Sequence, residues 1–154
     1  MLLSITELIN ISRWLKTDSI GITSGCFDLR HPYHVEYIKR CKDQCNKLIV
    51  LVDSDRLISI NKNKKTILPE RERAYMVNTQ AETVTFTAVM DDLHMLSAVA
   101  IAFRDAGNTV SIFKNSDKVY GAPLIKVRGV SNIIVPDIPG YCSTTDIIEA
   151  IRQK

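Results

Sequence analysis

Two histidines lie three positions apart at the end of the segment Gly25-Cys26-Phe27-Asp28-Leu29-Arg30-His31-Pro32-Tyr33-His34. An imidazolium donates hydrogen bonds to phosphoryl oxygens, and its ordinary pKa of about 6.5 lets a bound phosphate keep it protonated. A short β-branched run, residues 20–24, precedes the segment, and a helix is predicted to begin near Tyr33. Helix N-termini carry free N–H groups and a partial positive charge that favour anions. His31 and His34 therefore predict a phosphate site at a strand-to-helix turn.

The histidine pair also has a simpler interpretation, as two unrelated surface side chains. The chain contains three histidines in all, so a close pair at such a turn is suggestive but weak by itself. Neither a Walker A sequence nor a Gly-x-Gly-x-x-Gly sequence occurs, which argues against a P-loop NTPase and against a dinucleotide-dependent oxidoreductase. Support for a phosphate site must therefore come from other segments.

Strand and helix patterns alternate along the whole chain. The predicted strands are 20–24, 47–52, 84–88, 109–113 and 132–135, and the predicted helices are 4–15, 33–43, 69–79, 93–104 and 143–152. This alternation predicts an α/β fold, a Rossmann-like open parallel sheet with helices on both faces. Such sheets bind ligands beyond the carboxyl ends of their strands. We therefore expect the polar stretches 25–34, 53–66 and 114–117, which follow predicted strands, to converge on one site.

The size and composition of the chain exclude several classes of protein. Its 154 residues suit one domain, residues 1–154, with one core. No apolar run reaches the roughly 18 residues of a membrane helix, and the beginning of the chain lacks the pattern of a signal peptide. The net charge of +3 is too small to indicate binding to nucleic acid. We expect a cytoplasmic protein that binds neither membranes nor nucleic acid.

The four cysteines are Cys26, Cys41, Cys45 and Cys142, and none forms a Cys-x-x-Cys pair. They are interpreted as reduced thiols of a cytosolic protein that mainly fill the core. A zinc site built from Cys41, Cys45 and the two histidines matches no common ligand spacing. The sequence therefore predicts no protein-built metal site.

Four motifs, in order along the chain, resemble those of the cytidylyltransferase-like nucleotidyltransferases. Residues 25–34 resemble the family's Gly-(Cys/Thr)-Phe-Asp-x-x-His-x-Gly-His, and residues 52–55 resemble its Val-Asn-Ser-Asp after the second strand. The lysine-rich residues 62–65, followed by Glu-Arg-Glu-Arg at 70–73, resemble its lysine loop and Glu-x-Arg helix start. Residues 142–148 resemble its Ser-Thr-Thr-x-Ile-Ile turn. The likeness is greatest to the adenylyltransferase domain of the bifunctional heptose (ADP-heptose) enzymes.

This resemblance implies a fold of the nucleotidyltransferase α/β phosphodiesterase type and a transfer reaction. Members move a nucleotidyl group from ATP or CTP to a sugar phosphate or another small phosphate, release pyrophosphate and use Mg²⁺. The glycerol-3-phosphate cytidylyltransferases carry an arginine before the Ser-Thr-Thr turn, and residues 138–142 contain none, which favours ATP. Relatives are commonly dimers, so a homodimer is expected, with Trp14 and the first helix offering apolar contact.

The resemblance also implies roles for individual residues. His31 and His34 would stabilise the transferred phosphate and the departing pyrophosphate, and Lys62 or Lys64 would hold the triphosphate. The implied nucleotide-binding residues are Gly25, Cys26, Phe27, Asp28, Tyr33, Arg73, Asp117, Ser143, Thr144 and Thr145. Within this set, Asp28 would fix the loop, and Arg73 would support the site or contact the acceptor phosphate.

Each of these motifs has a simpler alternative. The lysine run can be a solvated loop, and Ser143 can be a helix N-cap that needs no ligand. Arg73 can pair with Glu70 one helical turn away. These alternatives remain open from the sequence alone.

Tyr33 stands where the family has glycine, which is the largest departure from the motifs. Glycine lets the backbone approach a nucleotide closely, whereas a tyrosine ring must swing out, stack on the ligand or block the cleft. Three hypotheses follow from this difference. The chain is an active nucleotidyltransferase, a catalytically impaired relative that binds nucleotide, or an interaction module that binds none.

Overall fold

The computed structural model describes residues 1–16, 19–115 and 125–154. Within these residues one parallel sheet contains the strands β1 (Ser19–Gly25), β2 (Lys47–Asp53), β3 (Phe86–Met90), β4 (Thr109–Asn115) and β5 (Val130–Val135). The strand order is β3-β2-β1-β4-β5, so the order reverses between β1 and β4. This is the arrangement of a Rossmann-like sheet, and the predicted fold class is confirmed.

The strands pair in register, so their carboxyl ends lie at the same edge of the sheet. Ile22 of β1 is opposite Ile49 of β2 and Ile112 of β4, and Gly25 is opposite Val52. The central strand residues are almost wholly buried, as expected for a parallel sheet covered on both faces. The polar residues that follow β1, β2 and β4 are therefore brought to one edge.

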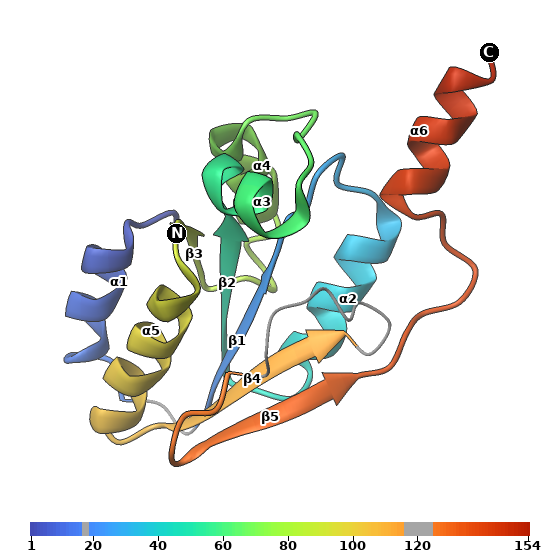
Figure 1. The fold of residues 1–154 in the computed structure, drawn as a ribbon. Coiled ribbons are helices and arrows are strands. Elements are labelled where there is room, and N and C mark those ends of the chain that lie inside the picture. Colours follow the sequence, from blue (N-terminus) through green and yellow to red (C-terminus); the bar gives the residue numbers. More distant parts are fainter. Residues whose placement is uncertain (17–18, 116–124) are drawn as a thin grey trace.

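The helices of the described residues are α1 (Ile5–Ser12), α2 (Pro32–Lys42), α3 (Asp55–Lys62), α4 (Glu70–Asn78), α5 (Leu93–Asp105) and α6 (Thr144–Arg152). α1 and α5 cover one face of the sheet, and α2 and α4 cover the other (Figure 1). Leu8 of α1 and Phe103 of α5 pack with Ile49 in one core cluster. Ile38 of α2 and Val77 of α4 pack with Val50 on the opposite face. Alternate residues of β2 thus serve the two cores.

Local sequence explains where several helices begin. The Ser4 amide donates to the Glu7 carboxylate at 2.7 Å, and the Glu7 amide donates to the Ser4 hydroxyl at 3.1 Å, which forms a capping box. Ser143 and Asp146 form the same reciprocal pair at the start of α6. The expected role of Ser143 as an N-cap is therefore present in the structure.

The structure differs from the sequence prediction in one additional helix and in the bounds of several elements. The polar stretch 53–66 contains the helix α3, which was not predicted. Its N-cap Ser54 accepts a hydrogen bond from the Leu57 amide, and Leu57 and Ile58 are buried beneath the otherwise polar helix. A helix this short depends on tertiary packing more than on its own propensity. In addition, β3 begins two residues later than predicted, because the Val84 amide bonds to the Gln80 carbonyl instead of joining the sheet.

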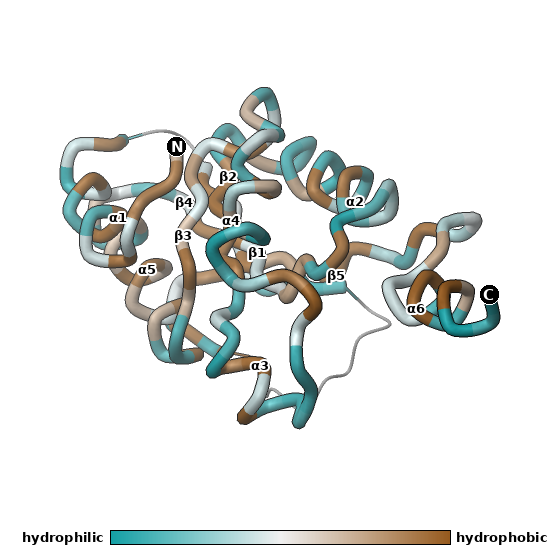
Figure 2. The backbone as a smooth tube through the Cα atoms, turned by 90° about the horizontal axis from the view of Figure 1, so that it is seen from above, coloured by the Kyte–Doolittle hydropathy of each residue, from teal (hydrophilic) through white to brown (hydrophobic). Residues whose placement is uncertain are grey.

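The last helix lies at the edge of the molecule. Seen from above in Figure 2, α1 and α5 lie on one side of the strands, whereas α2 and α6 lie on the other. None of the residues of α6 is buried, although it is strongly amphipathic. Among residues 1–16, 19–115 and 125–154, none of the helices combines the length and apolar character needed to cross a bilayer.

Candidate functional site

A cavity of about 470 Å³ lies at the carboxyl ends of β1, β2 and β4. The three polar stretches expected to converge all contribute to its wall, through residues 25–28, 53–64 and 114–115. The sequence-predicted site residues that line it are Gly25, Cys26, Phe27, Asp28, Tyr33, His34, Lys62, Lys64, Ser143, Thr144 and Thr145. His31 and Arg73 are not among the lining residues, and Asp117 lies outside the described residues. The fold thus brings together residues that are more than 100 positions apart in sequence.

The two histidines lie side by side at the start of α2, with His31 as the N-cap and His34 in the first turn. Their ring centroids are 4.1 Å apart, and the His31 amide donates to Nδ1 of His34 at 3.4 Å. That contact places the proton of a neutral His34 ring on Nε2. His34 is buried, and its ring meets the edge of the Phe27 ring with centroids 5.5 Å apart. The position of His34 is therefore fixed by packing as well as by the helix.

The first turn of α6 meets the first turn of α2. The Thr144 hydroxyl donates to the Asp28 carbonyl at 3.1 Å. Its oxygen lies 3.3 Å from Nε2 of His31, which is the donor because the hydroxyl proton is already used. Two helix N-termini with partial positive charge therefore face one end of the cavity, which suits a polyanion.

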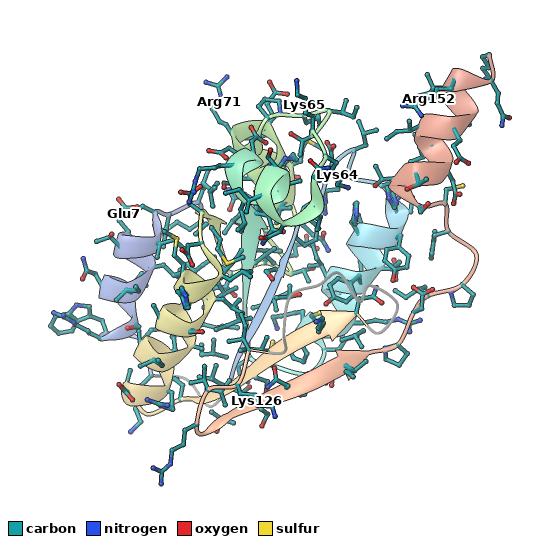
Figure 3. All side chains as sticks on the ribbon, in the orientation of Figure 1. Glu7, Lys64, Lys65, Arg71, Lys126 and Arg152 are labelled. Atoms are coloured by element: carbon teal, nitrogen blue, oxygen red, sulfur yellow. The ribbon has the colours of Figure 1, made fainter. Side chains whose placement is uncertain are left out.

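Asp28 joins the loop after β1 to the segment between the lysine loop and α4. Its carboxylate accepts hydrogen bonds from the amides of Ile67 at 2.7 Å, Leu68 at 3.0 Å and Leu29 at 3.1 Å. The side chain thus fixes both segments at once, which is the structural task expected of it. Lys64 lines the cavity, and Figure 3 shows it nearer to α2 than Lys65 is.

The loop after β1 has an unusual backbone. Phe27 and Leu29 have φ angles of 52° and 45°, in the left-handed region that non-glycine residues rarely adopt. A Cβ at Gly25 would lie 3.0 Å from the Phe27 ring, so glycine allows that ring to fold back beside the strand. Strain of this kind persists only where surrounding contacts hold it, and it is common at functional sites.

Arg73 is completely buried and lies behind the cavity wall. Its guanidinium donates to the Asp55 carboxylate at 2.7 Å, to the Cys26 carbonyl at 2.6 Å and to the Leu68 carbonyl at 3.0 Å. The simpler alternative, in which Arg73 pairs with Glu70, does not occur: Arg73 pairs with Asp55, and the Glu70 carboxylate accepts the Asp55 amide. The geometry makes Arg73 a support that joins α3, the lysine loop and the loop after β1. It does not reach into the cavity, so the alternative role of contacting the acceptor phosphate has no geometric basis here.

Burial dominates the electrostatics of the cavity floor. It raises the pKa of Asp53, against the opposing effects of Lys62 and Arg73. Burial likewise raises the pKa of the Cys26 thiol, although Arg73, Lys62 and Lys64 act to lower it. Cys26 is therefore a protonated thiol at neutral pH and not an activated nucleophile. The cavity is suited to electrostatic stabilisation and not to covalent catalysis through cysteine.

Tyr33 forms part of the cavity wall instead of swinging out into solvent. Its hydroxyl donates to the Asp137 carboxylate and accepts from the Asn115 side-chain amide. These contacts link the first turn of α2 to the end of β4 and to the segment after β5. Sequence reasoning did not identify Asn115 and Asp137 as partners of Tyr33. The available signal was that both follow the ends of predicted strands, at the edge of the sheet where the site was expected.

The comparison with protein families agrees with this geometry. Residues 22–150 match the family model described as Cytidylyltransferase-like. The chain belongs to this family. The match includes the histidine pair, the lysine loop and the turn before α6, and the resemblance inferred from the motifs is confirmed.

Curated relatives add a more specific similarity. The chain is 32% identical over 146 residues to the bifunctional protein HldE of Hyphomonas neptunium, covering 90% of this chain and 28% of that protein. It is 29% identical over 149 residues to HldE of Paramagnetospirillum magneticum, covering 92% of this chain and 29% of that protein. The chain therefore spans less than a third of the length of these relatives.

Solved structures share the fold at lower identity. A lipopolysaccharide core biosynthesis protein from Thermoplasma volcanium has a TM-score of 0.59 and 19% identity, with 79% of this chain and 98% of that chain covered. A pantoate-beta-alanine ligase from Francisella tularensis has a TM-score of 0.54 and 12% identity, with 99% and 77% covered. At these identities the structural likeness supports the fold.

Proposed function

We propose that this protein is a nucleotidyltransferase that transfers a nucleotidyl group from ATP to a sugar phosphate or a similar small phosphate and releases pyrophosphate. One observation carries the proposal. His34, Lys62, Lys64 and the first turn of α6 line one cavity, and His31 adjoins it through its contacts with His34 and Thr144. A nucleoside triphosphate is the ligand whose charge and length match this set of groups. The motif resemblance to the adenylyltransferase domain of the bifunctional heptose enzymes supports ATP as donor and a sugar phosphate as acceptor, and the similarity to HldE proteins agrees with that resemblance.

The proposed reaction is an in-line displacement at the α-phosphorus of ATP. An oxygen of the acceptor phosphate forms the new bond to the α-phosphorus, and the bond from that phosphorus to the oxygen bridging the β-phosphate breaks. Pyrophosphate leaves with that oxygen. The protein contributes alignment and charge stabilisation instead of a covalent intermediate. His34 and the α2 N-terminus stabilise the reacting phosphate, whereas Thr144 and Lys64 hold the departing pyrophosphate.

Mg²⁺ fits the donor set as a metal that arrives with the nucleotide. In the described part of the chain no cluster of three or more histidine, cysteine, aspartate or glutamate side chains could hold a metal ion. Mg²⁺ usually keeps several waters and binds substrate phosphates together with one or two carboxylates. When bound, the ion would neutralise charge on the pyrophosphate.

Association into a homodimer in the cytoplasm is part of the same proposal. Trp14, at the end of α1, is 87% exposed, and an indole of this size at the surface is typical of a contact with another protein chain. Sedimentation equilibrium of the wild type and of Trp14→Ser tests the dimer. A monomeric wild type would contradict it.

The reaction is tested by measuring pyrophosphate release in the presence of Mg²⁺. ATP and CTP are each combined with heptose 1-phosphate, mannose 1-phosphate and glycerol 3-phosphate. We expect release with ATP and a sugar phosphate, and no release when the acceptor is omitted. Release with CTP and glycerol 3-phosphate alone would assign the glycerol-3-phosphate cytidylyltransferase activity instead.

A second candidate function is a catalytically impaired relative that binds nucleotide. The position of Tyr33 favours it, because its ring is held in the cavity wall by Asn115 and Asp137. Calorimetry with ATP and the pyrophosphate assay, applied to the wild type and to Tyr33→Gly, separate the two functions. Binding without turnover in the wild type, with turnover gained in Tyr33→Gly, would identify the impaired relative. Absence of binding for every nucleotide would favour the interaction module.

A further inference from the structure

Asp53 occupies an unusual position for a carboxylate. It is the last residue of β2, and its side chain lines the same cavity as His34 and Lys64. The side chain is only 13% exposed. The motif that residues 52–55 resemble has an asparagine at this position, so this chain carries an ionisable carboxyl group where the motif has a neutral amide. A buried carboxyl group next to a site for polyanions requires an explanation.

The carboxylate of Asp53 is only partly satisfied by the described residues. Its Oδ2 lies 3.9 Å from Nζ of Lys62, which is an ion pair but longer than a hydrogen bond. Its Oδ1 is buried and has no hydrogen-bond partner in the described part of the chain. A buried carboxylate oxygen without a donor is costly, and such groups in native proteins usually meet a ligand or water. Rotation about χ2 of aspartate is soft, so either oxygen can turn toward the cavity.

The location of Asp53 decides which part of a ligand it faces. The donors for a triphosphate come from the first turns of α2 and α6, which lie beyond β1 on the side of β4 and β5. Asp53 lies on the other side of β1, at the end of β2, beside α3 and the start of α5. The part of the cavity beside Asp53 is therefore on the far side of β1 from the triphosphate donors. Lys62, next to Asp53, supplies a cation that suits a single phosphate.

We propose that Asp53 selects the acceptor, by accepting a hydrogen bond from a hydroxyl group of a phosphorylated polyol whose phosphate is held by Lys62. The inference rests on the proposed function, because it takes the acceptor, which binds beside ATP, to be a phosphate compound. It narrows the acceptor class to phosphates that carry hydroxyl groups near the phosphate. The apolar side chains Leu57, Leu93 and Leu96 form the rest of this part of the wall and pack against the ring carbons of the acceptor.

The test compares two phosphates of the same ring size that differ in their hydroxyl groups. Mannose 1-phosphate carries hydroxyls, and cyclohexyl phosphate carries none. Calorimetry measures the binding of each to the wild type, Asp53→Asn and Asp53→Leu. We expect the wild type to bind mannose 1-phosphate about tenfold more tightly than cyclohexyl phosphate. Asp53→Asn, which keeps one acceptor oxygen, reduces this ratio, and Asp53→Leu brings it to about one. Asp105→Asn, an exposed carboxylate on α5, is the matched control and leaves the ratio unchanged.

Several results would overturn the inference. Equal weakening of both phosphates in Asp53→Leu would show that Asp53 acts only by holding Lys62. If Asp53→Leu kept the wild-type ratio of the two affinities, Asp53 would have no role in selecting hydroxyl groups. The same conclusion would follow if the wild type bound neither phosphate. Weaker ATP binding in Asp53→Leu, with the ratio retained, would place Asp53 against the nucleotide. Failure of the proposed function gives a different result from failure of this inference. In that case pyrophosphate release would be absent, but the wild type would still bind mannose 1-phosphate more tightly than cyclohexyl phosphate.

Discussion

The first turns of α2 and α6 face the same end of the cavity, but they are held in different ways. α2 packs in the core through Tyr37, Ile38 and Cys41, which are all buried. α6 has no buried residue, and Thr144 in its first turn hydrogen-bonds to the Asp28 carbonyl and to His31. The phosphate-binding end of the cavity is therefore built from one helix fixed by packing and one fixed by hydrogen bonds.

The two helices are therefore held in position by different amounts of free energy. A hydrogen bond contributes about 1 kcal/mol net, whereas burying a large aliphatic side chain contributes about 2–3 kcal/mol. The position of α2 is thus set when the protein folds. The position of α6 is set by much less free energy, so a phosphate that contacts both N-termini stabilises α6 more than α2. The following variants test each half of this comparison, in order of decreasing effect.

The largest effect is expected at the packed helix, for His34→Ala. Loss of a preorganised donor to the reacting phosphate lowers kcat for pyrophosphate release by about 100- to 1,000-fold. His94→Ala, at an exposed position on α5, is the control and leaves kcat unchanged. Full activity of His34→Ala would show that the site is assigned to the wrong residues.

A matched pair of substitutions compares how the two helices are held. Ile38→Ala, at a fully buried position of α2, is expected to lower the free energy of unfolding by about 2–5 kcal/mol. Ile151→Ala, at a position of α6 that is 66% exposed, changes it by less than about 0.5 kcal/mol. Urea denaturation followed by circular dichroism measures both. Similar losses for the two variants would mean that α6 is packed against another surface in solution.

Thr144→Val keeps the shape of the side chain and removes the hydroxyl that joins α6 to the loop after β1. Since that hydroxyl bonds to the Asp28 carbonyl and to His31, we expect ATP to bind about tenfold more weakly, with a smaller change in kcat. Calorimetry and the pyrophosphate assay measure the two quantities. Thr79→Val, at the exposed C-cap of α4, is the control. Unchanged ATP affinity in Thr144→Val would exclude α6 from the nucleotide site.

The smallest effect concerns pH at the start of α6. Hydrogen bonds from the backbone N–H and the hydroxyl of Ser143 hold the pKa of Asp146 below its usual range. Because the folded-state pKa is the lower one, the cap stabilises α6 fully above the unfolded pKa of about 4 and is lost as the pH falls through the folded value. An NMR titration of the Asp146 carboxyl carbon measures this pKa, and Ser143→Ala should raise it. Titration of Asp146 at its usual value would contradict the capping box.

The fold, and which segments line the candidate site, could largely be predicted from the sequence. The roles of individual residues were harder to predict. Hydrophobic periodicity fixed the alternation of strands and helices, and the motifs at 25–34, 62–65 and 142–148 converge as expected. The helix α3 was missed because its short polar sequence has little periodicity of its own. Arg73 was expected near phosphate, but the position of Asp55 on α3 decides its partner, and α3 was not in the prediction.

By itself, the sequence determined the order of the elements, the parallel sheet and the family, because these depend on local periodicity and on motifs that are contiguous in the chain. Only the tertiary structure decided that Tyr33 is held by Asn115 and Asp137, that Arg73 is buried behind the cavity, and that Asp53 has a carboxylate oxygen without a partner among the described residues. Each of these depends on contacts between segments distant in sequence. Such contacts are set by how the helices pack on the sheet, which no local pattern encodes.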